Sequence, residues 1–98
     1  MKVITTSEVE ALVKCNTPIH MIDVREEEEA AEGMIPNATN IPLGLIEIKL
    51  DMLDKAKEYI IICRSGNRSA MAAQFLETKG YTVKNMTGGM LNYKGKTV

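Results

Sequence analysis

Apolar residues recur along this chain in short blocks whose spacing alternates between that of strands and that of helices. The extended blocks predict strands at residues 2–5, 19–24, 59–63 and 81–86, with a brief extended piece at 39–41. Apolar positions three or four residues apart predict helices at 7–14, 26–32, 45–53 and 70–79, and a short helix or turn follows residues 88–89. Strands that alternate with helices favour an α/β fold with right-handed crossovers. We therefore expect one open, mainly parallel sheet with helices on both of its faces.

Polar residues and glycines mark where these helices begin and end. Ser7 and Glu10 have the spacing of a capping box at the start of the first helix. Gly33 and Gly80 follow the second and fourth helical segments, a position where glycine commonly ends a helix. The strand at 59–63 is apolar on both faces, which is typical of a strand in the middle of a parallel sheet.

Length and composition limit the classes of protein to consider. The chain has 98 residues, 45% of them apolar and 26% charged, so we expect one domain over residues 1–98. A net charge of −1 gives no reason to expect nucleic acid or an anionic membrane as a partner. No apolar run is long enough to span a bilayer, and the N-terminus lacks the apolar core of a secretion signal.

Two cysteines, Cys15 and Cys63, predict separate thiols in a reducing cytoplasm. There is no Cys-x-x-Cys motif, and the single histidine, His20, lies within an apolar strand, so we expect neither a metal site nor a Cys–His pair. Cys15 falls near the end of the first helix and is expected to be inert. The alternative is that Cys15 is a resolving thiol that takes sulfur from Cys63.

Cys63 ends the most apolar strand and opens a polar loop that leads into the helix at 70–79. The thiol is thus predicted to face a helix N-terminus, where backbone N–H groups stabilise an anion. A cysteine of ordinary pKa is only about 3% thiolate at pH 7, so a nucleophilic Cys63 needs that stabilisation. A structural cysteine is the alternative, but it gives no reason for the two arginines, two serines and one glycine that follow.

The 63–69 loop and a second strand end define the candidate site. Gly66 permits the backbone angles of a tight cradle, and Ser69 can donate a hydroxyl hydrogen bond or cap the following helix. Asp23 and Arg25 end another strand, at the edge where parallel sheets bind ligands, and we expect them to form a supporting ion pair. The candidate site is therefore Cys63 as nucleophile, the substrate-binding loop residues Arg64, Ser65, Gly66, Asn67, Arg68 and Ser69, and Asp23 and Arg25 in support.

The spacing between Cys63 and Arg68 separates two kinds of chemistry. Four residues lie between them. Protein tyrosine phosphatases resemble this loop but place five residues between cysteine and arginine, which widens the cradle for a tetrahedral phosphate. The shorter loop favours a single sulfur atom carried on Cys63.

Three segments follow one another in an order that is typical of a known family. They are Asp23-Val24-Arg25 followed by Glu29, Gly33, Ile35-Pro36, Ala38 and Asn40-Ile41-Pro42; the 63–69 loop; and Gly88-Gly89-Met90 followed by Tyr93. Over nearly the whole chain they resemble the rhodanese family, specifically its single-domain sulfurtransferases. The family usually has His, Gly and Trp where this chain has Met34, Asn37 and Tyr93.

The resemblance implies a sulfurtransferase that works through a persulfide on Cys63. Thiosulfate is an example of its donor, and cyanide or a thiol takes the sulfur; no metal or organic cofactor is implied. A protein that receives or supplies a persulfide is a further possible partner. Two alternatives remain: a carrier that passes sulfur from protein to protein, and a phosphatase or arsenate reductase of the same fold.

Overall fold

Five parallel strands form the centre of the protein in the computed structural model, which describes all residues 1–98. Their order across the sheet is β1-β5-β4-β2-β3, so β4 lies in the middle between β5 and β2. The expected parallel sheet is confirmed, and every strand pair in it is parallel. The strands are β1 (Lys2–Thr5), β2 (His20–Asp23), β3 (Thr39–Asn40), β4 (Glu58–Ile62) and β5 (Thr82–Thr87).

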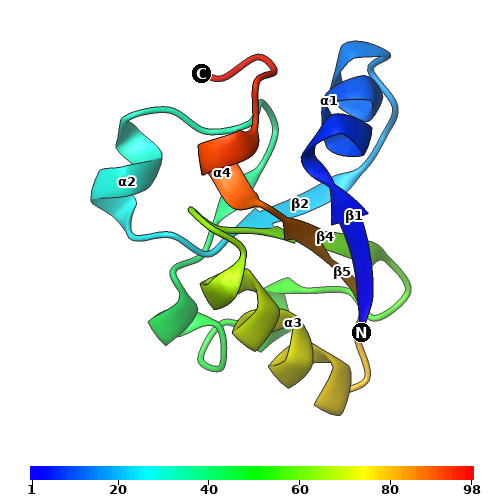
Figure 1. Ribbon diagram of the computed structural model, residues 1–98. Coiled ribbons are helices and arrows are strands. Elements are labelled where there is room, and N and C mark those ends of the chain that lie inside the picture. The colour runs from blue at the N-terminus through cyan, green and yellow to red at the C-terminus, as the bar shows by residue number, and fades with distance from the viewer.

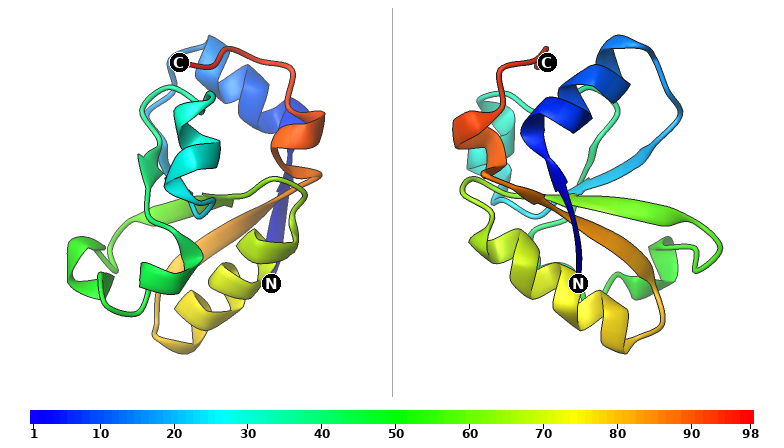
Figure 2. Two further views of the ribbon diagram at one scale, coloured as in Figure 1. Left: turned by 90° about the vertical axis from the view of Figure 1, so that its left-hand side faces the viewer. Right: turned by 45° about the vertical axis from the view of Figure 1, so that its right-hand side comes forward.

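Helices cover both faces of this sheet, as the alternating pattern predicted (Figure 1). The helices are α1 (Thr6–Lys14), α2 (Glu27–Ala31), α3 (Asn67–Thr78) and α4 (Gly89–Asn92), with two 3₁₀ turns, η1 (Leu43–Leu45) and η2 (Leu50–Met52). Figure 2 shows α3 on one side of the sheet and α1 with α4 on the other. None of these helices combines the length and the apolar character that crossing a bilayer requires.

Alternation along β4 sends successive side chains into two separate cores. Tyr59, Ile61 and, just beyond the strand, Cys63 pack into the core beneath α3. Ile60 and Ile62 pack into the core shared with α1 and α4. Because side chains of a strand alternate between faces, this register places the thiol of Cys63 on the side from which α3 begins.

The capping box predicted for the first helix is wrong by two residues. Thr5, not Ser7, is the N-cap of α1: its hydroxyl accepts from the N–H of Glu8, and the Glu8 carboxylate accepts from the N–H of Thr5. Thr5 has the extended backbone of a cap because it is also the last residue of β1. The strand therefore passes into the helix without an intervening turn, so the N-cap lies two residues closer to the N-terminus than predicted.

Two other helical predictions need correction. The helix predicted at 45–53 is instead the two 3₁₀ turns η1 and η2. Leu45, Leu50 and Leu53 still pack against the core beneath α3, so the apolar spacing reflects burial without a continuous helix. The helix predicted from Ala70 begins earlier, at Asn67, so Arg68 and Ser69 belong to its first turn.

Candidate active site

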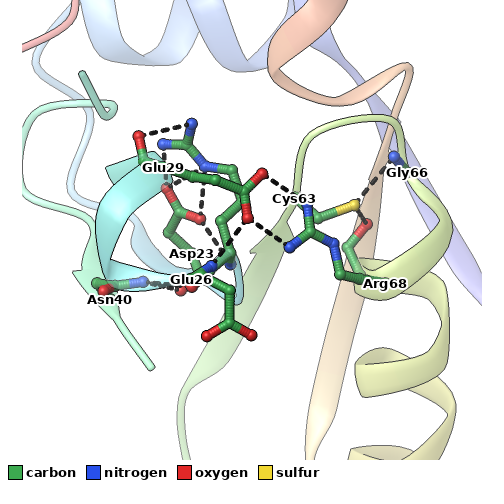
Figure 3. A network of polar contacts seen from close by, with 9 residues as sticks. Asp23, Glu26, Glu29, Asn40, Cys63, Gly66 and Arg68 are labelled. Carbon is green, nitrogen blue, oxygen red and sulfur yellow. Dashed lines mark hydrogen bonds and ion pairs between the residues drawn. The ribbon is translucent and has the colours of Figure 1, made fainter. Parts of the chain in front are cut away.

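The thiol of Cys63 lies directly beyond the carboxyl end of β4 and faces the first turn of α3, as predicted. Its side chain is fully buried. The N–H of Gly66 donates to the Cys63 Sγ at 3.0 Å, and the Ser69 Oγ lies 3.2 Å from the same sulfur (Figure 3). Gly66 is the N-cap of α3 with φ of 103°, a left-handed conformation that favours glycine. The cradle expected from the sequence is therefore present on the sulfur.

Two opposing effects set the acidity of this thiol. Burial disfavours the thiolate and raises the pKa of Cys63. The Ser69 hydroxyl, when its proton is turned toward the sulfur, and hydrogen bonds from the backbone of Ser69, Gly66 and Ser65 lower it. The hydrogen bonds prevail, and the pKa of Cys63 lies below its ordinary value. The loop can thus hold a sulfur anion without a histidine partner.

Ser69 is not the helix cap that its position suggested. It lies in the first turn of α3 and is fully buried, with its hydroxyl donating to the Oδ1 of Asn85 on β5. The Nδ2 of Asn85 in turn donates to the Gly66 carbonyl at 3.3 Å. Asn85 therefore connects β5 to the 63–69 loop through two hydrogen bonds.

Helix α4 fixes the other side of the loop. The N–H groups of Met90 and Leu91 donate to the carbonyls of Cys63 and Arg64, each at 2.9 Å. Gly89, with φ of 61°, makes this approach possible, since a Cβ there would collide with the Arg64 carbonyl. Gly89, the first residue of α4, thus lets the backbone of α4 approach the backbone of the loop next to the thiol.

Arg68 belongs to the site but is directed at a carboxylate. Its Nη1 and Nη2 donate to the two oxygens of Glu29 on α2, at 2.6 and 2.8 Å (Figure 3). This bidentate bond lowers the pKa of Glu29 from its ordinary 4.5 to about 2, and it raises that of Arg68. The positive charge that the sequence placed near the sulfur is therefore already paired across the site.

The other loop residues turn outward. Arg64, Ser65 and Asn67 are exposed, and Arg64 meets α4 through its backbone carbonyl. A hollow of about 420 Å³ lies beside the loop and is lined by Arg64 together with residues of α2 and α4. Arg64 is thus free to meet a molecule that approaches this edge.

Asp23 and Arg25 form the expected ion pair, at 2.7 Å and almost fully buried. The guanidinium of Arg25 also donates to the carbonyls of Gly33 and Glu29. Asn40 on β3 adds hydrogen bonds from its Nδ2 to the carbonyls of Asp23 and Arg25, both at 2.9 Å. This cluster fixes the chain beyond β2 and the ends of α2 next to the loop.

Histidine and the second cysteine lie elsewhere. His20 is exposed at the amino end of β2, opposite to the edge that holds Cys63, and its ring packs near that of Tyr59. Cys15 is an exposed free thiol at the C-cap of α1. No histidine, cysteine, aspartate and glutamate side chains gather in a group able to hold a metal ion.

Sequence reasoning missed two residues that complete the site. In the sequence Glu29 belongs only to a motif, and no local pattern links it to Arg68, 39 positions away. Asn85 lies within the strand predicted at 81–86. It occupies a buried position on the same face of β5 as Val83, and a polar residue at a core position of a strand is the signal that could have identified it.

A buried thiol that accepts from a backbone N–H, at the carboxyl edge of a parallel sheet, defines a class of α/β proteins built around one cysteine loop. Within that class the chain belongs to the rhodanese-like sulfurtransferase family: the Rhodanese-like domain matches residues 5–96. This chain is 43% identical over 97 residues to YtwF of Bacillus subtilis, which is provisionally named a sulfurtransferase. The match covers 99% of this chain and 94% of that protein.

Two further relatives extend the comparison. YrkF of Bacillus subtilis, provisionally named a sulfur carrier protein, is 40% identical over 86 residues, which are 87% of this chain and 46% of that protein. The crystal structure of a rhodanese-like domain protein from Staphylococcus aureus matches with a TM-score of 0.91 at 38% identity, covering 98% of this chain and 94% of that one.

Proposed function

We propose that this protein is a sulfurtransferase that moves a sulfane sulfur from a donor such as thiosulfate to a thiophilic acceptor through a persulfide on Cys63. The observation that carries the proposal is the cradle around the Sγ: one N–H bond at 3.0 Å, the Ser69 hydroxyl at 3.2 Å and a lowered pKa. Membership of a sulfurtransferase family supports it. We assign the activity to residues 1–98 as one domain.

In the first half-reaction, the Cys63 thiolate attacks the outer sulfur of thiosulfate. A bond forms between Sγ and that sulfur while the bond between the two sulfurs of thiosulfate breaks. Sulfite leaves with the electron pair, and Cys63 is left as a persulfide anion, so charge is conserved. This is nucleophilic catalysis with a covalent intermediate.

In the second half-reaction, cyanide or a thiolate attacks the outer sulfur of the persulfide. The new bond forms to the acceptor, the bond between the two sulfurs on Cys63 breaks, and the thiolate of Cys63 is restored. N–H groups of the 63–69 loop stabilise the persulfide anion as an oxyanion hole stabilises oxygen. Neither step calls for a metal or an organic cofactor.

The neighbouring charges have separate roles in this proposal. Exposed Arg64 attracts the anionic donor to the edge of the sheet. Arg68, held by Glu29, sets the position of the first turn of α3, whose residues touch the sulfur. Asp23 and Arg25 support the adjacent wall. The reaction needs Cys63 as a free thiol, a state that a reducing compartment such as the cytoplasm maintains.

Intact-mass measurement after exposure to thiosulfate tests the proposal. We expect the Cys15→Ser protein to gain one sulfur atom and the Cys63→Ser protein to gain none. Thiosulfate–cyanide transfer should follow the same pattern. No mass gain with thiosulfate, glutathione persulfide or a protein persulfide would overturn the proposal, and aryl-phosphate hydrolysis lost in Cys63→Ser would point to a phosphatase.

A second candidate function is protein-to-protein sulfur carriage, favoured by the similarity to the protein named as a sulfur carrier. A carrier loads sulfur on Cys63 in the same way but releases it only to a protein thiol. Loaded protein mixed separately with cyanide, with glutathione and with a cysteine-containing protein acceptor distinguishes the two. Rapid loss of the sulfur to the small acceptors indicates an enzyme.

A further inference from the structure

Four hydrogen bonds form a closed ring around the Cys63 thiol. The Ser69 Oγ lies 3.2 Å from the Sγ, and the Ser69 hydroxyl donates to the Asn85 Oδ1. The Asn85 Nδ2 donates to the Gly66 carbonyl at 3.3 Å, and the Gly66 N–H donates to the Sγ at 3.0 Å. Ser69 and Asn85 are 0% and 5% exposed, so water does not replace these partners.

The ring contains one hydroxyl proton for two acceptors. A serine hydroxyl has a single proton to donate. Asn85 is oriented by its bond to the Gly66 carbonyl, so its Oδ1, rather than its Nδ2, faces Ser69. When Cys63 is a neutral thiol, its S–H can donate to Ser69 and the ring is satisfied. When Cys63 ionises, the Sγ and the Oδ1 compete for the Ser69 proton.

We propose that Asn85 is a positioning residue that holds the Ser69 hydroxyl proton on its own Oδ1 and thereby restrains ionisation of Cys63. Turning the proton toward the thiolate leaves the buried Oδ1 without a donor, which is unfavourable. Leaving it on the Oδ1 directs an oxygen lone pair at the thiolate. Asn85 therefore opposes the thiolate in either arrangement.

This role of Asn85 rests on the proposed function, in which the ring of hydrogen bonds favours the sulfur-loaded state of Cys63. Once Cys63 carries the outer sulfur, the negative charge moves to that atom and the Sγ becomes a neutral sulfide. The Sγ then no longer competes for the proton, and Ser69 can donate to Asn85 without loss. Asn85 thus disfavours the empty thiolate relative to the loaded state, which favours uptake of sulfur.

Charged groups around Cys63 do not replace this effect, because those on the elements packed against it are paired or exposed. No titratable side chain lies in α4 or η1. The paired groups are Arg68–Glu29 on α3 and α2, Arg25–Asp23 at the end of β2, and Lys84–Glu58 on β5 and β4. The exposed groups are Arg64 of the loop, Glu77 of α3, His20 of β2, and Glu26, Glu27 and Glu28 at the start of α2.

Ultraviolet titration of the thiolate tests the proposal without any sulfur donor. The background is Cys15→Ser, and the spectrum of the protein that also carries Cys63→Ser is subtracted. We expect Asn85→Ala to lower the pKa of Cys63 by about one unit, which is about tenfold more thiolate below that pKa. Asn85→Val, which suits a strand, is made in parallel for the case that the alanine variant does not fold.

Two matched variants separate this mechanism from simple loosening of the loop. Asn85→Asp keeps an acceptor oxygen for Ser69, so the pKa of Cys63 should stay at or above its wild-type value. In a Ser69→Ala background, Asn85→Ala should have no further effect on the pKa, because Asn85 acts through Ser69.

Opposite outcomes overturn the proposal. They are an unchanged or raised pKa in both Asn85→Ala and Asn85→Val, a fall of equal size in Asn85→Asp, or a fall that persists with Ser69→Ala. A protein that titrates as expected but takes up no sulfur contradicts the proposed function and leaves the role of Asn85 intact.

Discussion

The carboxyl ends of β2 and β4 are neighbours in the sheet, yet they are built from opposite kinds of interaction. At the end of β2, the carboxylate of Asp23 and the guanidinium of Arg25 are buried against each other at 2.7 Å. Beyond β4, the thiol contacts a backbone N–H, a hydroxyl and, through it, an amide, all of them neutral. The first end holds permanent charges in pairs, whereas the second holds a group whose charge can change.

The difference shows how a small sheet can combine a rigid wall with a group whose charge can change. Removing one partner of a buried ion pair is strongly destabilising, so the pair holds the chain around it in one arrangement. Neutral donors stabilise an anion without demanding one, so Cys63 can be a thiol, a thiolate or, as proposed, a persulfide. The Arg68–Glu29 bond joins the two ends and keeps the cation of the loop engaged with α2.

Breaking the charged end should have the largest effect on stability. Asp23→Asn leaves Arg25 buried without a counter-charge, and we expect the free energy of unfolding to fall by about 3–5 kcal/mol. Urea denaturation measures this as a lower midpoint at unchanged slope. Asp51→Asn, at an exposed acid in η2, is the control and should change stability by less than about 0.5 kcal/mol. A decrease in the free energy of unfolding of less than about 1 kcal/mol for Asp23→Asn would show that the ion pair does not stabilise the fold.

Crowding the neutral end should have an intermediate effect. Gly89→Ala places a Cβ against the Arg64 carbonyl and requires a left-handed backbone of alanine. We expect a loss of about 1–3 kcal/mol in the free energy of unfolding, together with slower uptake of sulfur by Cys63 because the loop shifts. Gly44→Ala, where a Cβ meets no atom within 4 Å, is the matched control. Equal behaviour of the two variants in both assays would contradict the close packing of α4 on the loop.

Breaking the Arg68–Glu29 ion pair, which joins the ends of β2 and β4, should have the smallest effect on stability. The side chains of Arg68 and Glu29 are about a third exposed (32% and 31%), so Glu29→Gln should cost about 1 kcal/mol or less at neutral pH. The pKa of Glu29 is depressed to about 2 in the folded protein from an ordinary 4.5. Its contribution is thus complete above pH 4.5 and is lost as the pH falls toward 2.

Denaturation at several pH values checks this linkage. The stability difference between wild type and Glu29→Gln should shrink as the pH is lowered from 4.5 to 2. Glu28→Gln, at an exposed neighbour in α2, removes the same charge and is the control. A difference that is constant or grows in acid would mean that the ion pair does not stabilise the fold.

Much of the sheet and of the sulfur site could be predicted from the sequence because both depend on local order along the chain. The strand, the loop and the helix at 58–78 follow one another directly, so the spacing of Cys63 and Gly66 already implies a cradle. The ion pair of Asp23 and Arg25 was predicted for the same reason, since the two residues share one strand end.

The partners of the site could not be predicted because they are distant in sequence. Arg68 meets Glu29 across 39 positions, and Ser69 meets Asn85 across 16. The helix predicted at 45–53 failed for another reason. Apolar side chains three residues apart serve 3₁₀ turns as well as an α-helix, and only packing against the core distinguishes the two.

The strand order has a consequence for how the protein acquires its site during synthesis. The first strand of the sheet in chain order, β1, pairs only with the last one, β5, and Asn85 of the thiol ring also lies on β5. A nascent chain that has emerged only as far as α3 holds Cys63 but can neither dock its first strand nor close the ring. Pairing of strands so far apart is slow to form. The surroundings of the thiol are therefore completed only after β5 has been synthesised, so the cysteine exists before Asn85, the hydrogen-bond partner of Ser69 on that strand.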